Sequence, residues 1–248
     1  MKWLIEYQNA GKRYGANIAL KGLSLRIERG EFVVFIGRSG GGKTTALEMI
    51  NAMVLPDEGV VTVNGEDVAV ADPISLRRSI GYCVQSISLF PHMTIADNIS
   101  YVPALLGEKK DARTARAREL LELVGLPEDC FKRYPRQLSG GEAQRVGVAR
   151  ALAADPEIVL MDEPFGSTDN ITRGMLQNEL AGLHAKLQKT IVFVTHDLNE
   201  TRKLANRIVL FNGGAIEQIG TFEELLAEPA SAFVKEFMTG AAGWNRGG

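Results

Sequence analysis

One glycine-rich segment carries the clearest chemistry in this sequence of 248 residues. Residues 37–44 read Gly-Arg-Ser-Gly-Gly-Gly-Lys-Thr, which fits the phosphate-loop pattern of glycine, four residues, then glycine, lysine and threonine. An apolar run at 32–36 precedes the segment, and a helical pattern at 44–53 follows it. Glycines let successive backbone N–H groups turn toward phosphate oxygens, and the start of a helix adds positive potential. The segment therefore predicts a nucleotide phosphate site; a chance glycine-rich turn is disfavoured by this strand and helix.

Two side chains of this loop have defined expected roles. Lys43 reaches the β- and γ-phosphates of a nucleoside triphosphate, and the Thr44 hydroxyl ligates Mg²⁺. The residues expected to hold the nucleotide are Gly37, Ser39, Gly40, Gly42, Lys43, Thr44 and Thr45.

A second strand pattern ends in two carboxylates. Residues 158–161 are apolar, and Asp162 and Glu163 follow them. In phosphate-loop enzymes the first such acid holds Mg²⁺. Because successive side chains of a strand point to opposite faces, we expect Asp162 beside the metal and Glu163 placed to polarise an attacking water. Solvated acids at a plain strand end are the alternative, which the phosphate loop disfavours.

A third segment predicts a second anion-binding helix end. Residues 138–142 read Leu-Ser-Gly-Gly-Glu, with Ser139 placed as the N-cap of a helix. One nucleotide cannot easily use both this helix end and the phosphate loop. The economical arrangement is a head-to-tail dimer in which Ser139 of one chain faces the γ-phosphate held by Lys43 of the other. An ordinary helix cap is the alternative, and it is the simpler explanation of this segment taken alone.

The elements that must position these residues alternate in type. Strand patterns occupy 32–36, 79–84, 158–161, 190–194 and 208–211, and helical patterns lie at 44–53, 141–153, 174–188 and 198–204. This alternation predicts an α/β fold with a mostly parallel sheet. The segments 3–7, 23–27 and 60–63 are expected to form a smaller antiparallel β layer.

Residues 92–138 hold no convincing strand and are predicted to form a helical insert. Two helices are expected there, at 94–106 and 111–124, the first capped by Thr94 and kinked or shortened by Pro103. The last segment, 241–248, is expected to be a frayed tail.

Composition excludes several classes of protein. Lys plus Arg is 28 and Asp plus Glu is 30, a net charge of −2, which disfavours a strongly basic nucleic-acid binder. The two cysteines and three histidines are dispersed and show neither a disulfide framework nor zinc spacing. Apolar runs stay well below the roughly 18 residues of a membrane span, and Glu6 interrupts any signal-peptide pattern. We therefore expect a soluble, cytosolic chain whose membrane role, if any, depends on a partner.

The phosphate loop, the Leu-Ser-Gly-Gly-Glu segment and the acidic strand end, in their order along the chain, resemble the nucleotide-binding subunit of an ABC transporter. The resemblance implies ATP and Mg²⁺ as cofactors, with further roles for residues that match family positions. Adenine stacking falls to Tyr14, contact with Mg²⁺ and the transmembrane partner to Gln85, and the catalytic base to Glu163. Asp169 matches the acid of the dimer-interface loop and His196 the γ-phosphate contact, and the signature is Ser139, Gly140 and Gly141. An ordinary packed aromatic is the alternative for Tyr14, and a hydrogen-bonded strand-end histidine for His196.

The resemblance also implies domain boundaries. It predicts an ATPase domain over 1–240, made of a core at about 1–85 and 157–240 and a helical insert with the signature at about 86–156. Four positions depart from the family's common pattern: Arg38 stands for proline, Gly41 for serine or cysteine, Thr168 for leucine and Asn170 for proline. The first two belong to a loop that acts through its backbone, whereas the last two concern packing at the dimer interface.

Not all ABC ATPases are transporters, so the subclass must be argued separately. Chromosome-maintenance relatives place long coiled coils between phosphate loop and signature, whereas Lys43 and Ser139 lie 96 positions apart here. The basic stretch at 109–118 is accompanied by acids, leaving a local charge of +1 over 108–122, which favours a solvated helix face. No nucleic-acid partner is therefore expected.

Segments at 134–137, 81–95 and 169–177 are similar to importer subunits, the last two to the osmoprotectant group that moves glycine betaine, choline or carnitine. The implied partners are a membrane permease contacted around Gln85 to Phe90, a second ATPase chain and, indirectly, a substrate-binding protein. The implied location is peripheral, on the cytoplasmic side of the inner (plasma) membrane. Phe90 is predicted to be exposed in an extended turn before Pro91, with packing inside the insert as the alternative.

Two other functions stay open from the sequence. One is an importer ATPase for amino acids or another small organic solute. The other is a non-transport ABC ATPase that acts on nucleic acid or ribosomes.

Overall fold

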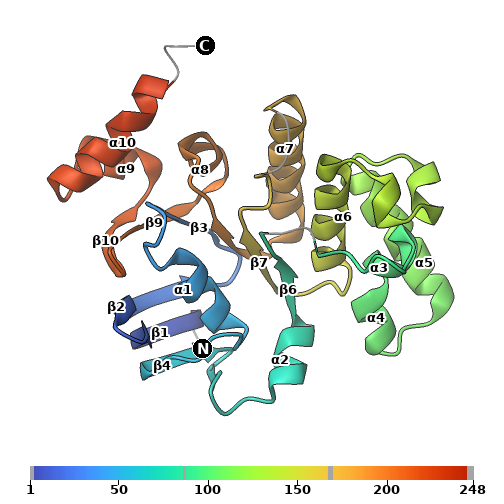
Figure 1. The fold of residues 1–248 in the computed structure, drawn as a ribbon, viewed down its shortest axis with the longest axis horizontal. Coiled ribbons are helices and arrows are strands. Elements are labelled where there is room, and N and C mark those ends of the chain that lie inside the picture. The colour runs from blue at the N-terminus through green and yellow to red at the C-terminus, as the bar shows by residue number, and fades with distance from the viewer. Residues whose placement is uncertain (1–2, 86–87, 167–169, 245–248) are drawn as a thin grey trace. The chain divides into compact units, whose positions relative to one another are not determined.

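The computed structural model describes residues 3–85, 88–166 and 170–244, and the chain forms two compact units (Figure 1). The first unit combines Met1–Leu76 with Thr190–Gly248, and the second unit is Arg77–Lys189. The predicted domain boundaries near 85 and 156 stay a prediction.

An antiparallel β layer opens the first unit, as the sequence predicts. Its strand order is β2-β1-β4-β5. The strands are β1 (Trp3–Tyr14), β2 (Asn17–Glu28), β4 (Glu58–Val63) and β5 (Glu66–Asp67). The Tyr7 hydroxyl donates a hydrogen bond to the Ala46 carbonyl at 2.7 Å, and this buried bond ties the layer to helix α1 (Lys43–Ile50).

A second sheet of the first unit runs in the order β10-β9-β3-β8. Its strands are β3 (Phe32–Gly37), β8 (Thr190–Val194), β9 (Arg207–Asn212) and β10 (Ala215–Gly220). Both β8 and β9 pair with β3 in parallel, and every residue of β3 and β8 is buried. Covering on both faces explains why these strands are continuous apolar runs rather than alternating ones. The parallel sheet that the sequence predicts is confirmed for this unit.

The helices of the first unit include elements that the sequence pattern does not predict. Helix α8 (Leu198–Leu204) lies where it is expected, whereas α9 (Phe222–Ala227) and α10 (Ala232–Trp244) are additional. Helix α10 therefore continues into the segment that the sequence predicts as a tail from residue 241. Helix α2 (Pro73–Ser79), also unpredicted, leads from the first unit into the second.

The second unit pairs two parallel strands with a group of helices. The strands are β6 (Ile80–Cys83) and β7 (Ile158–Asp162). The helices are α3 (Ile95–Ile99), α4 (Tyr101–Leu105), α5 (Lys110–Leu123), α6 (Gly140–Leu152) and α7 (Asn170–Leu187), with short 3-10 turns at Glu128–Lys132 and Pro135–Gln137. Thr94 caps α3 as predicted, because its hydroxyl accepts the Asp97 N–H at 3.1 Å.

The helix predicted at 94–106, kinked or shortened by Pro103, is interrupted at Ser100, three residues before the proline. The segment 94–106 is two helices, and the first ends before Ser100. Pro103 has no N–H to donate to the carbonyl four residues earlier, so it is excluded from the interior of a long helix. The break places Pro103 in the first turn of α4, where a missing N–H costs nothing.

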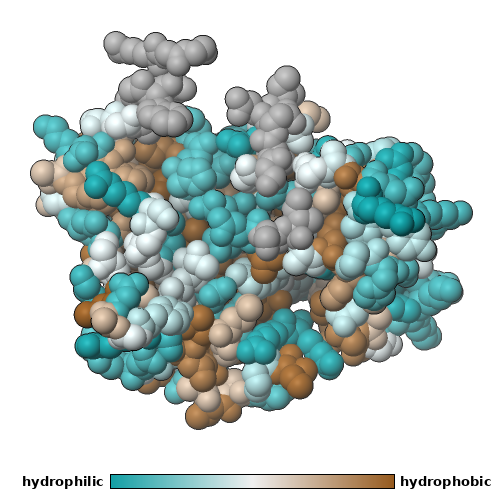
Figure 2. Space-filling model, viewed as in Figure 1, coloured by the Kyte–Doolittle hydropathy of each residue, from teal (hydrophilic) through white to brown (hydrophobic). Residues whose placement is uncertain are grey.

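None of the helices among the described residues is long and apolar enough to cross a membrane. On the face drawn in Figure 2, hydrophobic side chains lie in small groups among hydrophilic ones.

Candidate functional site: a phosphate loop and a capped signature helix

The phosphate loop joins the end of β3 to α1, and three of its glycines, Gly37, Gly40 and Gly42, have backbone that other residues rarely adopt. The φ angle of Gly37 is 150° and that of Gly42 is 96°. A Cβ atom on Gly37 would lie 2.3 Å from the Phe211 carbonyl oxygen, and one on Gly42 would lie 2.5 Å from the Ala19 carbonyl oxygen. Because neighbouring backbone occupies this space, the loop is held in one shape.

Lys43 is folded back over the loop. Its buried ammonium donates hydrogen bonds to the carbonyl oxygens of Gly37 and Arg38, both at 2.9 Å. The hydroxyl-bearing residues beside it differ in exposure, since Thr44 is exposed and Thr45 half-buried. This geometry holds a positive charge against the backbone of the phosphate loop, which suits a polyphosphate.

The first turn of α1 is open to an anion. Gly42 is its N-cap, and no side chain of the described residues caps it; the turn also holds no acid. Uncapped N–H groups at a helix N-terminus bind anions through hydrogen bonds and the helix dipole.

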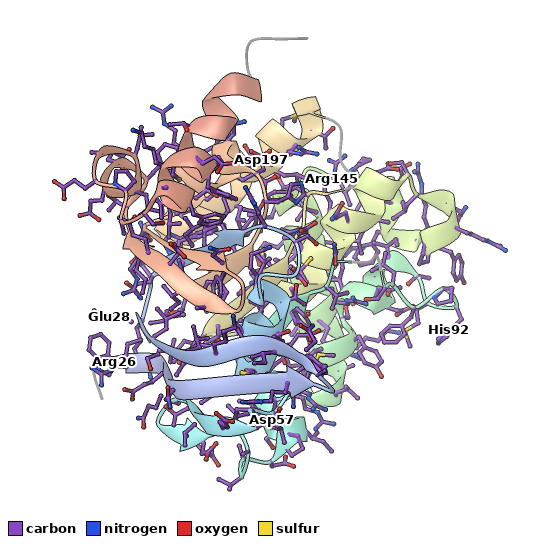
Figure 3. The ribbon with its side chains drawn as sticks, turned by 60° about the vertical axis from the view of Figure 1, so that its left-hand side comes forward. Arg26, Glu28, Asp57, His92, Arg145 and Asp197 are labelled. Atoms are coloured by element: carbon purple, nitrogen blue, oxygen red, sulfur yellow. The ribbon has the colours of Figure 1, made fainter. Side chains whose placement is uncertain are left out.

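Two more predicted residues lie in the first unit, and the first is Tyr14. It ends β1 and is 50% exposed, with the Lys12 ammonium 5.7 Å from its ring centroid. Lys12 is itself paired with Asp57 at 2.8 Å, and Asp57 is labelled in Figure 3. An exposed ring with a cation beside it fits the expected adenine contact better than it fits a packed core residue.

The second, His196, follows β8 and is exposed. Strand β8 runs parallel to β3, so His196 and the phosphate loop leave the sheet at the same edge. The turn around it is fixed: the buried Thr195 hydroxyl donates to Glu200 at 2.6 Å, and Asp197 caps α8 by accepting the Asn199 N–H at 2.7 Å. The first unit therefore brings together the phosphate loop and His196.

The two acids of the second unit are separated by backbone geometry rather than by the pleat of a strand. Asp162 is buried at the end of β7, whereas Glu163 lies beyond the strand with φ at 45°. The expectation that alternation along the strand separates them is wrong, because Glu163 is in the left-handed region. A non-glycine residue there is held at a cost of about 1–2 kcal/mol, and such positions cluster at functional sites.

Glu163 is held from two sides. The Gln85 amide donates to its carboxylate at 3.3 Å, and the Gln144 amide donates to its backbone carbonyl at 3.3 Å. Gln85 is a predicted site residue, whereas the sequence does not point to Gln144. It lies on α6, behind the signature, and its partner is distant in the chain, so no local signal could reveal it.

The signature residues form a capping box on α6. Ser139 accepts the Glu142 N–H at 3.3 Å, and Glu142 accepts the Ser139 N–H at 2.7 Å. The hydrogen bond that the Ser139 backbone donates to the Glu142 carboxylate, followed by the interaction of that carboxylate with the Ser139 side chain, lowers the pKa of the Glu142 carboxyl below its ordinary value. A Cβ atom on Gly140 would meet nothing within 4 Å, so another molecule could approach its backbone. Gly141 follows it in the same first turn of the helix.

The donors that the sequence assigns to Mg²⁺ are all hard oxygens: the Thr44 hydroxyl, the Asp162 carboxylate and the Gln85 amide oxygen. Within the part of the chain that the structure describes, no group of three or more His, Cys, Asp or Glu side chains could hold a metal ion by itself. Mg²⁺ commonly takes one or two carboxylates and completes its shell with substrate phosphates and water, so these residues fit the ion. Asp169 lies outside the described residues.

A groove of about 390 Å³ lies beside Phe90 in the second unit. Phe90 is half-buried, with its ring centroid 4.6 Å from that of Tyr101, so both predictions for it are partly met. Among the residues that the structure describes, the lining includes three arginines, Arg77, Arg78 and Arg150, and no acid. His92 lies near the ring and is exposed, as Figure 3 shows.

Comparison with known proteins shows which protein family the chain belongs to. Residues 20–166 match the ABC transporter family, and the chain therefore belongs to that family. A solved dimeric structure of the ATP-binding cassette MJ0796, bound to ADP and Pi, is 34% identical with a TM-score of 0.81 and covers 88% of this chain and 98% of that one. The predicted ABC ATPase fold is thus confirmed.

Particular relatives narrow the comparison. The chain is 50% identical to the carnitine transport ATP-binding protein OpuCA of Listeria monocytogenes, covering 95% of this chain and 59% of that protein. It is 51% identical to the choline transport ATP-binding protein OpuBA of Bacillus subtilis, covering 95% of this chain and 62% of that protein. The chain therefore spans about three fifths of the length of these relatives.

Proposed function

We propose that this chain is the ATP-hydrolysing subunit of an ABC importer for a quaternary-amine osmoprotectant. The single observation that carries the ATPase part is the phosphate loop, in which the Lys43 ammonium is held by the carbonyls of Gly37 and Arg38 beside the uncapped start of α1. The dimeric relative with ADP and Pi supports the same chemistry.

Each site residue has a proposed task. Lys43 and the loop backbone hold the β- and γ-phosphates of ATP, and Tyr14 stacks on adenine. The oxygens of Thr44, Asp162 and Gln85 hold Mg²⁺, which neutralises charge on the phosphates when bound. Glu163 orients and deprotonates water, and His196 contacts the γ-phosphate.

Glu163 suits a general base because its position is defined before substrate arrives. Its backbone is fixed in the left-handed region, and Gln85 and Gln144 hold its carboxylate and its carbonyl. A preset geometry avoids reorganisation during the reaction.

The proposed assembly is a head-to-tail dimer in which Ser139, Gly140 and Gly141 of one chain face the nucleotide of the other. The open space beside Gly140 supports this arrangement, because a phosphate could approach the backbone there. Asp169 is proposed to lie at the same interface.

The proposed membrane partner is a permease, docked at the groove beside Phe90. The half-buried ring offers an apolar anchor, and the three arginines favour a permease segment that carries a carboxylate. The location proposed with this contact is the cytoplasmic side of the membrane, and the substrate-binding protein is proposed to act on the other side.

The solute is proposed from likeness to the carnitine and choline transport subunits. The test is uptake by the complete complex, reconstituted in vesicles with ATP inside and labelled carnitine, choline, glycine betaine, amino acids or sulfate outside. We expect ATP-dependent uptake of the quaternary amines and none with Glu163→Gln. Uptake of the other solutes alone would contradict the osmoprotectant assignment, and a chain that never co-purifies with a permease would contradict the importer assignment.

A further inference from the structure

The side chain of Arg150 joins two features of the second unit that have separate proposed tasks. Arg150 lies near the end of α6, whose first turn is the signature. Its guanidinium donates to the Ser88 carbonyl at 2.8 Å and to the Ser88 hydroxyl at 3.2 Å. Ser88 lies two residues before Phe90, the proposed permease anchor. The hydrogen bonds from Arg150 therefore link the signature helix α6 to the loop that carries this anchor.

The same guanidinium also covers the anchor. Its central carbon lies 5.8 Å from the Phe90 ring centroid, within the range of a cation–π contact. Tyr101 packs against the ring at 4.6 Å between centroids. Arg150 therefore fixes both the backbone before Phe90 and the orientation of its ring.

A purely stabilising role explains this arginine poorly. Among the described residues its partners are a carbonyl, a hydroxyl and a ring, with no carboxylate, and burial lowers the pKa of its guanidinium. Arg150 is half-buried, and a guanidinium that is partly removed from water without an ion pair carries a desolvation cost. The planar guanidinium of arginine can donate several hydrogen bonds to backbone and also stack on a ring, whereas the ammonium of lysine cannot do both.

A second buried side chain ties the far part of this loop together. The Asn98 amide, fully buried, accepts the Phe90 N–H at 2.8 Å and donates to the carbonyls of Phe90, Met93 and Thr94 at 3.0–3.3 Å. A displacement of Ser88 and Phe90 would therefore also displace the rest of segment 88–94.

We propose that Arg150 is a positioning residue that couples the signature helix to segment 88–94, so that nucleotide engagement at Ser139 shifts the permease anchor. This inference rests on the proposed ATP-dependent function. Helix α6 connects the two sites rigidly: Ser139 and Arg150 are about 16 Å apart along its axis at 1.5 Å per residue. Gln144, between them, ties the same helix to Glu163.

Hydrogen exchange of the full chain tests the coupling. The background is Glu163→Gln, which is expected to trap MgATP, and exchange is followed in peptides covering the phosphate loop, the start of α6 and segment 88–94. In the parent we expect MgATP to slow exchange at least threefold in all three. With Arg150→Gln, the first two peptides should respond as before, whereas segment 88–94 should lose its response. Arg150→Lys keeps the positive charge but not the planar guanidinium, and segment 88–94 should lose at least half of its response to MgATP.

A matched control is Arg118→Gln, because Arg118 also covers a ring, that of Phe131 at 5.0 Å, but belongs to α5. It should behave as the parent. An unchanged response of segment 88–94 in both Arg150 variants would overturn the coupling, as would a parent segment that ignores MgATP while the phosphate loop responds.

Two further outcomes would show that Arg150 does not transmit nucleotide engagement. If segment 88–94 of the variants exchanges many-fold faster even without nucleotide, Arg150 is only a structural clamp and the coupling is overturned. If MgATP protects none of the three parent peptides, nucleotide binding itself fails, and the coupling fails with it. The variants' melting temperatures verify that they are folded, with Arg150→Lys as the milder change.

Discussion

Helices α1 and α6 both have glycine-rich starts, but they differ in how the backbone N–H groups of their first turns are satisfied. Helix α1 begins at Gly42, and among the described residues no side chain caps it. Helix α6 begins with a reciprocal cap between Ser139 and Glu142. A start without a side-chain cap leaves donors for a ligand, whereas a capped start is stable before any ligand arrives.

The difference bears on how each segment is proposed to recognise phosphate. The phosphate loop depends on backbone held at unusual angles and on one lysine. This explains why Arg38 and Gly41 can depart from the family pattern, since a backbone site tolerates different side chains. The signature combines a side-chain cap with open space beside Gly140, which leaves room for the nucleotide that the proposed dimer would bring there.

The largest expected effect comes from Glu163→Gln. The amide keeps the shape and can still accept from Gln85, but it cannot remove a proton. We expect hydrolysis to fall by about 10²-fold or more, as for loss of a general base. A coupled assay measures the rate, and calorimetry should show that MgATP still binds.

Glu142→Gln is the matched control, because it makes the same change at the cap of α6. It should keep most of the activity. Parental hydrolysis by Glu163→Gln would remove Glu163 from the catalytic role.

The next effect tests the open helix start. Lys43→Ala removes the ammonium from the loop, and we expect the dissociation constant for MgATP, measured by calorimetry, to rise by at least tenfold, about 1.4 kcal/mol. Lys189→Ala is the matched lysine, since its ammonium also contacts oxygens, the Asp155 carboxylate at 2.9 Å and the Asp155 carbonyl at 3.2 Å, and Asp155 is not a predicted site residue. Its effect should be under threefold. Equal weakening by the two variants would mean that charge in general, and not the loop, binds the phosphates.

A glycine pair sharpens the contrast between the two helices. Gly42→Ala brings a Cβ within 2.5 Å of the Ala19 carbonyl oxygen at φ 96°, so we expect a loss of about 2 kcal/mol or more of folding stability. Gly140→Ala meets nothing within 4 Å and should leave stability unchanged or slightly raised. Urea unfolding measures both.

The same pair has opposite consequences for assembly. If the signature receives a phosphate from a second chain, Gly140→Ala in the Glu163→Gln background should weaken the ATP-dependent dimer seen by sedimentation, despite normal folding. A full-strength dimer would contradict close approach at Gly140.

Much of the fold can be predicted because its strands are continuous apolar runs. The phosphate loop and the Ser139 cap are also predictable, since both are local patterns. Strand β10 escapes prediction because its residues are half-buried and show no alternation. Helix α9 is unpredicted although a signal exists: Thr221 and Glu224 form a capping box.

The parts that cannot be predicted depend on contacts distant in the chain. The left-handed backbone of Glu163 and its hold by Gln144 have no local sequence pattern. The same is true of Arg150 and Ser88, which are 62 residues apart. Sequence alone gives the chemistry of such side chains but not the partner that fixes them.

The smallest expected effect concerns the charge of the α6 cap. Hydrogen bonds from Ser139 hold the pKa of Glu142 below its ordinary value, so the carboxylate contributes stability above the pKa of the unfolded chain, about 4.3. That contribution is lost as pH falls through the lower, folded pKa. Glu142→Gln keeps a reciprocal cap but removes the charge at the helix start, so we expect a loss of about 0.3–1 kcal/mol at neutral pH.

Urea unfolding from neutral pH down to about pH 3 measures this difference. The parent should lose its advantage over Glu142→Gln as the carboxylate protonates, so the two stability curves should converge. Helix α1 has no acid in its first turn, so its start adds no comparable dependence. A gap that stays constant with pH would mean that the cap acts through hydrogen bonds alone. The signature helix would then resemble α1 in carrying no charge of its own, and the contrast between the two helix starts would reduce to the presence of the Ser139 hydroxyl.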